Sequence, residues 1–253
     1  MFAIFGCEHV KYPKEFKPYE YGQIPITHLI CLCKDVCKFM ILQAERLWEF
    51  IMELKRETAH GLTDRVIQFG EGNFLRGFVD WMFDKLNKET GFGAGVTLVQ
   101  PLEMGLVDKI MEQDGLYTLI LRGLQNGEKV YDTTKVECIT KGINPYSDWE
   151  GFLNLASVPT YRFIVSNTTE AGIEYKEEDA ANAPNLSYPG KLTLLLKKRF
   201  DLGLGGFILI PCELIDYNGD NLKKCIIKYA ESWNLGQDFI KWIEEENYFT
   251  NTL

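Results

Sequence analysis

One segment of this 253-residue chain restricts its fold strongly: V-I-Q-F-G-E-G-N-F-L-R-G at residues 66–77. Its first four residues predict a buried strand, the paired glycines a tight turn, and the apolar spacing that follows a helix. In such a unit the second glycine lets backbone approach a pyrophosphate, and the first helical N–H groups face the anion. Leu75 stands where the usual motif has a third glycine, so a plain strand–turn–helix connection stays an alternative.

The candidate dinucleotide-binding residues of this segment are Val66, Ile67, Gln68, Phe69, Gly70, Glu71, Gly72, Asn73, Phe74, Leu75, Arg76 and Gly77.

From residue 61 onward, short apolar runs alternate with amphipathic stretches. Strands are predicted at residues 66–69, 96–100, 117–121, 136–139, 162–167 and 207–212. Helices are predicted at residues 73–87, 149–156, 191–200, 222–233 and 239–246. This alternation predicts an α/β fold, a Rossmann-like, doubly wound and mostly parallel sheet.

Residues 1–60 differ from the rest, with eight basic and eight acidic residues and four of the seven cysteines. A helix is predicted at residues 38–58, with Gly61 as its stop. We therefore expect an appended helical segment at 1–60 and a dinucleotide-binding domain at 61–253. The spacing of Cys31, Cys33 and Cys37 matches no standard metal site, so reduced thiols and no metal are expected.

Composition excludes several functions. The net charge of −9 argues against a nucleic-acid partner. No sustained apolar run or signal peptide is visible, which favours a cytoplasmic protein without a membrane partner. No histidine follows His60, so residues 61–253 hold no Ser-His-Asp, Cys-His or His-liganded zinc chemistry.

Two more segments follow predicted strands, at the edge where doubly wound sheets bind ligands. In the first segment, residues 166–172, Asn167 and Thr168 are candidate cofactor ligands and Glu170 is a candidate substrate-edge residue. The alternative for this segment is a polar cap at the end of the strand. In the second segment, residues 211–220, Glu213 is the other substrate-edge candidate. The acidic residue expected after the second strand is not obvious, with Glu103 the nearest, so these residues leave NAD or NADP open.

The segments VIQFGEGNFLRGFVDW, QDGLYTLILRG, FIVSNTTEAGI, SYPGKLT and IPCELIDYNGDNLK together resemble the mannitol dehydrogenase family, from about residue 65 to residue 253. The resemblance implies a Rossmann domain that binds NAD, with G-x-G-x-F-x-R in place of three glycines. It implies the interconversion of D-tagaturonate and D-altronate, a sugar-acid reaction of hexuronate catabolism. Family members continue into a helical domain that carries the catalytic lysine. We expect this chain to stop before that domain, its natural packing partner, so no catalytic residue is assigned and the chain alone is expected to be inactive.

Three alternatives stay open. Within the same family, the chain could belong to a fructuronate or mannitol dehydrogenase. Outside enzymes, it could be a non-catalytic module that only holds NAD. It could also be a fragment without a function of its own.

Overall fold

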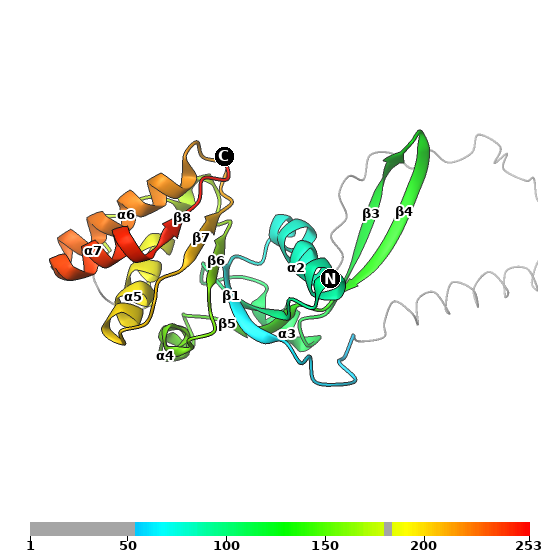
Figure 1. Cartoon of the computed structure of the whole chain (residues 1–253), viewed down its shortest axis with the longest axis horizontal. Helices are drawn as coiled ribbons and strands as arrows, with labels where there is room; N and C mark the ends of the chain where they lie inside the picture. The colour runs from blue at the N-terminus through cyan, green and yellow to red at the C-terminus, as the bar shows by residue number, and fades with distance from the viewer. Residues whose placement is uncertain (1–53, 180–183) are drawn as a thin grey trace, which may run out of the picture. The chain divides into compact units, whose positions relative to one another are not determined.

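The computed structural model of the chain describes residues 54–179 and 184–253 (Figure 1). Within these residues the main sheet has six strands in the order β5-β2-β1-β6-β7-β8. They are β1 (Thr63–Phe69), β2 (Ala94–Val99), β5 (Ile139–Ile143), β6 (Phe163–Ser166), β7 (Ile208–Pro211) and β8 (Tyr248–Phe249). Every neighbouring pair is parallel, so the predicted α/β, doubly wound sheet is confirmed.

The strand order fixes where a ligand can bind. From β1 the chain proceeds to β2 and β5, and then returns to place β6 on the other side of β1. The connections therefore diverge between β1 and β6. In open parallel sheets, the crevice at the carboxyl ends of two such strands is the usual ligand site.

Helices cover both faces of the sheet because successive side chains of a strand point to opposite faces. Ile67 and Phe69 are buried in a core formed with α4 (Trp149–Asn154), η2 (Leu155–Ser157), α5 (Tyr188–Asp201), α6 (Asn218–Ser232) and α7 (Gln237–Glu246). Val66 belongs to a second core, with η1 (Leu75–Val79), α2 (Asp80–Thr90) and α3 (Val107–Glu112). Figure 1 shows α2 on one side of β1 and α5, α6 and α7 on the other.

Local sequence explains where some helices begin and end. The Ser187 hydroxyl caps α5 by accepting a hydrogen bond from the Gly190 N–H, and Pro189 lies in the first turn. This cap starts α5 three residues before the predicted helix at 191–200. At a helix C-terminus, Gly91 caps α2 with a left-handed φ of 68°.

The placement of strands 117–121 and 136–139 in the main sheet is wrong. Instead, β3 (Tyr117–Gln125) and β4 (Glu128–Val136) form a separate antiparallel hairpin, which projects from the sheet in Figure 1. Its turn residues Asn126 and Gly127 have φ of 54° and 85°, and Asn-Gly is the preferred pair for a two-residue hairpin turn. The strand that joins the sheet is β5, directly after the hairpin.

The four cysteines of the first 60 residues lie outside the described residues. So does most of the helix predicted at residues 38–58. The described end of that stretch, residues 54–58, is not helical, so the extension of the helix to Thr58 is wrong. Arg56 is bonded to the sheet domain instead. Its side chain donates to the carbonyl oxygens of Asp114, at 3.0 Å, and of Glu137 and Ile139, both at 2.6 Å.

Candidate functional site

The glycine turn lies at the junction of β1 and β6. Gly70 follows β1 and donates its N–H to the Val99 carbonyl at 3.1 Å, while the Asn167 N–H donates to the Phe69 carbonyl at 3.1 Å. Gly70 has φ of +114°, and a Cβ there would lie 2.9 Å from the Asn167 carbonyl oxygen. The close approach of the β1 and β6 loops therefore requires glycine at this position.

Gly72 differs from Gly70 in its surroundings. A Cβ at Gly72 would meet nothing within 4 Å, so the protein itself leaves space at this position. Asn73 and Phe74 are already helical, and the Arg76 N–H donates to the Gly72 carbonyl at 3.1 Å. The first N–H groups of a helix have no intrahelical acceptors and attract anions. This open backbone before a helix fits a pyrophosphate.

Arg76 holds the turn from inside. Its buried guanidinium donates to the Glu71 carbonyl at 2.9 Å and to the Asn73 side-chain oxygen at 2.7 Å. The Tyr117 hydroxyl in turn donates to the Arg76 carbonyl at 2.6 Å. Arg76 thus positions the backbone of the turn, and hairpin strand β3 supports it.

The predicted residue Gln68 forms a buried polar pair beneath the turn with Asp80, a residue that the sequence did not predict. The Gln68 side-chain amide donates to the Gly70 carbonyl at 3.1 Å and to an Asp80 carboxylate oxygen at 3.4 Å. Both side chains are completely buried, and burial raises the pKa of Asp80 to about 7. Asp80 and Asp84 stand one helical turn apart on the buried face of α2, a placement that charged residues reach only with partners. The spacing of Asp80 and Asp84 was therefore the sequence signal available for buried polar groups on this helix.

The other predicted residues of the first segment have structural positions. Val66, Ile67 and Phe69 are core residues of β1, and Leu75 is a core residue of η1. Gly77 has ordinary packing against Leu119. These residues support the turn and line neither of the two cavities at the carboxyl edge of the sheet.

Two cavities lie along the carboxyl edge beside this junction. The larger, about 590 Å³, is lined by the loops after β2, β5 and β6. The smaller, about 390 Å³, lies between the loops after β6 and β7. Thr169 and Ala171 line both, so the two form adjacent parts of one crevice. Of the residues predicted here, Thr168 lines the larger cavity, and Asn167 and Glu213 the smaller.

Glu213 ties the β6 and β7 loops together. Its carboxylate accepts hydrogen bonds from the Thr168 N–H and hydroxyl, both at 3.0 Å, and from the Ser166 hydroxyl at 3.1 Å. Asn167 adds a bond from its side-chain amide to the Cys212 carbonyl at 2.6 Å. Because three donors already bond the Glu213 carboxylate, its geometry suits a positioning role.

The loop between these two strands is strained. Thr169 has φ of 81° and ψ of 166°, a region that β-branched residues rarely adopt. Glu170 begins the short helix η3 (Glu170–Gly172) directly after it. Strain of this kind is concentrated at ligand sites, which agrees with the position of Thr169 between the two cavities.

Lys191 of α5, which the sequence analysis did not single out, lies buried below the larger cavity. Its ammonium group donates to the carbonyl oxygens of Leu186 and Pro101, at 2.5 and 3.2 Å, and to the Tyr146 hydroxyl at 3.0 Å. Burial lowers the pKa of Lys191 to about 8. The three acceptors belong to three loops that line the cavity, so this lysine joins them.

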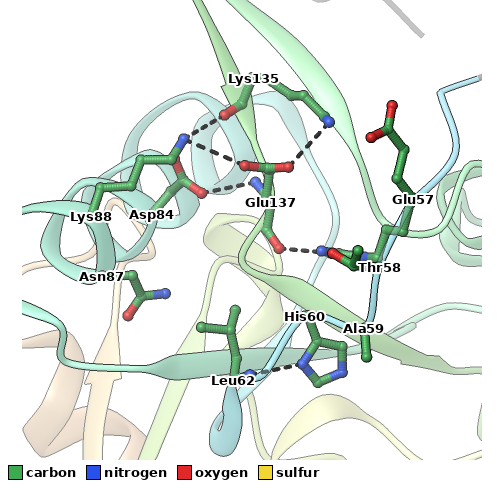
Figure 2. A pocket seen from close by; sticks show the side chains of 11 residues that line it. Glu57, Thr58, Ala59, His60, Leu62, Asp84, Asn87, Lys88, Lys135 and Glu137 are labelled. Atoms are coloured by element: carbon green, nitrogen blue, oxygen red, sulfur yellow. Dashed lines mark hydrogen bonds and ion pairs between the residues drawn. The ribbon is translucent and has the colours of Figure 1, made fainter.

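A separate pocket of about 460 Å³ lies away from the predicted residues, between residues 56–62, α2 and β4 (Figure 2). Figure 2 shows ion pairs of Lys88 with Asp84 and Glu137, and of Lys135 with Glu137. Because both lysines are already paired, they suit packing of the Arg56 segment better than binding an anion.

Among the described residues, no group of three or more His, Cys, Asp or Glu side chains is placed to hold a metal ion. No helix in residues 54–179 and 184–253 is long and apolar enough to span a membrane.

A six-stranded parallel sheet with a glycine turn and a helix start at its switch point defines a Rossmann-type dinucleotide-binding domain. The chain belongs to the mannitol dehydrogenase family, whose Rossmann domain matches residues 64–253.

Curated relatives include the altronate oxidoreductases of Shigella sonnei (strain Ss046) and Escherichia coli O1:K1 / APEC. Each is 49% identical over 196 residues, which are 75% of this chain and 41% of the relative. The chain therefore spans about two fifths of the length of these relatives.

Solved structures that share the fold include two sugar-alcohol dehydrogenases. Mannitol 2-dehydrogenase of Pseudomonas fluorescens, in a ternary complex with NAD and D-mannitol, has a TM-score of 0.66 at 19% identity and covers 79% of this chain and 44% of its own. A substrate-free D-sorbitol dehydrogenase has a TM-score of 0.63 at 22% identity, covering 77% and 43%.

Proposed function

We propose that this chain binds NAD, with the pyrophosphate on the glycine turn and the remainder of the cofactor along the carboxyl-edge crevice. The observation that carries the proposal is the contrast between the two glycines. Gly70 is required by the protein's own backbone, whereas the space beside Gly72 is open and directly precedes the helix start. A turn of this shape suits a ligand that approaches the backbone closely.

The proposed reaction is the interconversion of D-tagaturonate and D-altronate in hexuronate catabolism. It is supported by the 49% identity to altronate oxidoreductases. Bound NAD would supply the hydride acceptor or donor. In this chain Asn167 and Thr168 would face the nicotinamide end of the cofactor, with Glu213 holding Thr168 in place and Glu170 near the sugar acid.

An apolar groove beside the crevice suggests the partner that would complete the site. It has a volume of about 400 Å³, and its walls include the exposed side chains of Phe74, Phe78, Met82 and Leu214. Exposed apolar patches of this kind mark interaction surfaces. We propose that the helical catalytic domain of the family packs here, so that the sugar-acid substrate binds between the two domains.

We also propose an appended segment at residues 1–60 and an NAD-binding domain at 61–253, with the end of the segment bonded to the domain through Arg56. The cytoplasm is the proposed compartment, because the sugar acid and NAD are both metabolites of that compartment.

Thermal unfolding of the 253-residue polypeptide with and without NAD tests cofactor binding. At 100 times Kd a ligand stabilises its protein by about 2.7 kcal/mol, which for a domain of this size raises Tm by roughly 5–10 °C. An unchanged Tm at millimolar NAD would contradict the proposal.

A fusion of this chain to the helical domain of an altronate oxidoreductase tests the substrate. We expect NADH oxidation with tagaturonate, and less with fructuronate or fructose. A preference for either of the latter substrates would favour the related dehydrogenases. NAD binding without turnover of any of them would favour a non-catalytic module.

A further inference from the structure

We infer that Glu71 selects NAD over NADP, an inference that rests on the dinucleotide binding proposed above. NADP differs from NAD by a phosphate on the 2′-oxygen of the adenosine ribose. Sheets of this order usually recognise the free ribose hydroxyls with a carboxylate at the end of the second strand. In this chain β2 is followed by Gln100 and Pro101, which provide no carboxylate.

Glu71 brings a carboxylate to that place from the neighbouring loop. It lies between the two glycines of the turn, and its Oε1 atom accepts a hydrogen bond from the Leu106 N–H at 3.0 Å. A Cβ built on Gly105 would collide with the same oxygen and with the side-chain amide of Gln100. The Glu71 carboxylate therefore lies against the segment that follows β2.

This carboxylate lacks one hydrogen bond. Glu71 is only 8% exposed, and its Oε2 atom is buried with no hydrogen-bond partner in the described part of the chain. Burial raises the pKa of Glu71, while the Leu106 N–H and the Arg76 charge act against this increase. A buried acceptor without a donor is unfavourable, and a ribose hydroxyl between the turn and the β2 loop is a suitable donor.

A 2′-phosphate would meet the opposite situation. It would bring a second negative charge to a carboxylate in a medium of low dielectric constant, which is repulsive. The cation that acts on this carboxyl, Arg76, is already bonded to the Glu71 carbonyl and the Asn73 side chain. These bonds hold the guanidinium against the turn, where Arg76 is only 5% exposed and presents little surface to a phosphate.

Calorimetric titration of the full chain with NAD and with NADP tests the inference, without any need for turnover. We expect the wild-type chain to bind NAD more tightly. Glu71→Gln removes the charge but keeps the shape, and we expect it to reduce the preference for NAD by about 10- to 100-fold, the effect of one hydrogen bond to a charged group. Gly105→Ala should displace the same carboxylate and also reduce the preference.

Asp108→Asn is the matched control, because it removes an exposed carboxylate from the first turn of α3, two residues after Leu106 and outside both cavities, and should leave the preference unchanged. An unchanged preference in folded Glu71→Gln and Gly105→Ala would overturn the inference, while the proposed function stands. Loss of the preference in Asp108→Asn alone would assign the selection to Asp108 instead. If the wild-type chain binds neither nucleotide, the proposed function fails, and the selectivity inference fails with it.

Discussion

Separate replacement of Gly70 and Gly72 distinguishes a glycine that the fold needs from one that a ligand needs. At Gly70 any other residue is held at φ of +114°, with its Cβ 2.9 Å from the Asn167 carbonyl oxygen and 3.2 Å from a Leu75 methyl carbon. Backbone strain of this kind costs about 1–3 kcal/mol, and overpacking costs a similar amount. We expect Gly70→Ala to lower the free energy of unfolding by about 2–4 kcal/mol and Tm by roughly 5–15 °C.

Gly72→Val should behave differently. The position has no left-handed φ, and no atom lies within 4 Å of the added Cβ, so the Tm of the free protein should stay within about 2 °C of wild type. The branched side chain would occupy the space proposed for the pyrophosphate. We expect NAD affinity to fall by more than tenfold, because close backbone approach is lost.

Differential scanning fluorimetry of both variants, with and without NAD, measures the two effects together. Gly72→Val should lose the NAD-dependent increase in Tm, and calorimetry gives its Kd directly. Equal Kd values for Gly72→Val and the parent would refute the role assigned to the turn. A Tm decrease in Gly72→Val as large as that in Gly70→Ala would refute the distinction between the two glycines.

Three further predictions concern stability and turnover. The folded pKa of Asp80, about 7, lies above its ordinary 3.8, so the folded state holds the proton more tightly and the free energy of unfolding should fall by about 2–3 kcal/mol between pH 5 and 8. Urea titrations should show this decrease in the wild-type chain and not in Asp80→Asn. An equal pH dependence in the variant would contradict the assignment. Deletion of residues 1–53 should keep the cooperative thermal transition, while deletion through His60 should lower Tm because the Arg56 bonds are lost. Loss of the transition in the shorter deletion would contradict the assignment of residues 1–53 to an appended segment. The 253-residue polypeptide with NADH and tagaturonate should show no turnover by nicotinamide absorbance. Neither Glu213 nor Lys191 is placed to transfer a proton to the substrate, because the Glu213 carboxylate is bonded to three donors and Lys191 is buried below the cavity. Robust turnover would disprove this account of the two residues.

The sequence predicted the central strands β1, β2 and β6 because their apolar runs are mostly buried on both faces. All six residues of β2 are buried, and such strands read as continuous apolar runs. The hairpin was misplaced because its outer strand β4 is largely exposed and polar, so apolar periodicity does not reveal it. Only the Asn126-Gly127 pair marked its turn.

The candidate site was predictable where backbone chemistry defines it. Glycine spacing located the turn at Gly70 and Gly72, and the polar residues after β6 and β7 located the crevice. The buried supports were harder to predict. The spacing of Asp80 and Asp84 was a signal for the first of them, whereas Lys191 resembles an ordinary charged residue on a helix. The burial of Lys191 depends on which loops fold over it, and a local sequence pattern carries no information about that contact.

The pairing of β1 with β6 has a consequence for the order of folding. Val66 pairs with Phe163, so the central junction joins segments roughly 100 residues apart, and contacts of such long range form slowly. The local hairpin of β3 and β4 closes across a two-residue turn and needs no such search. We therefore expect the crevice beside Gly70 and Asn167 to form late in folding. A nucleotide added during refolding would trap the completed domain without accelerating the steps that precede it.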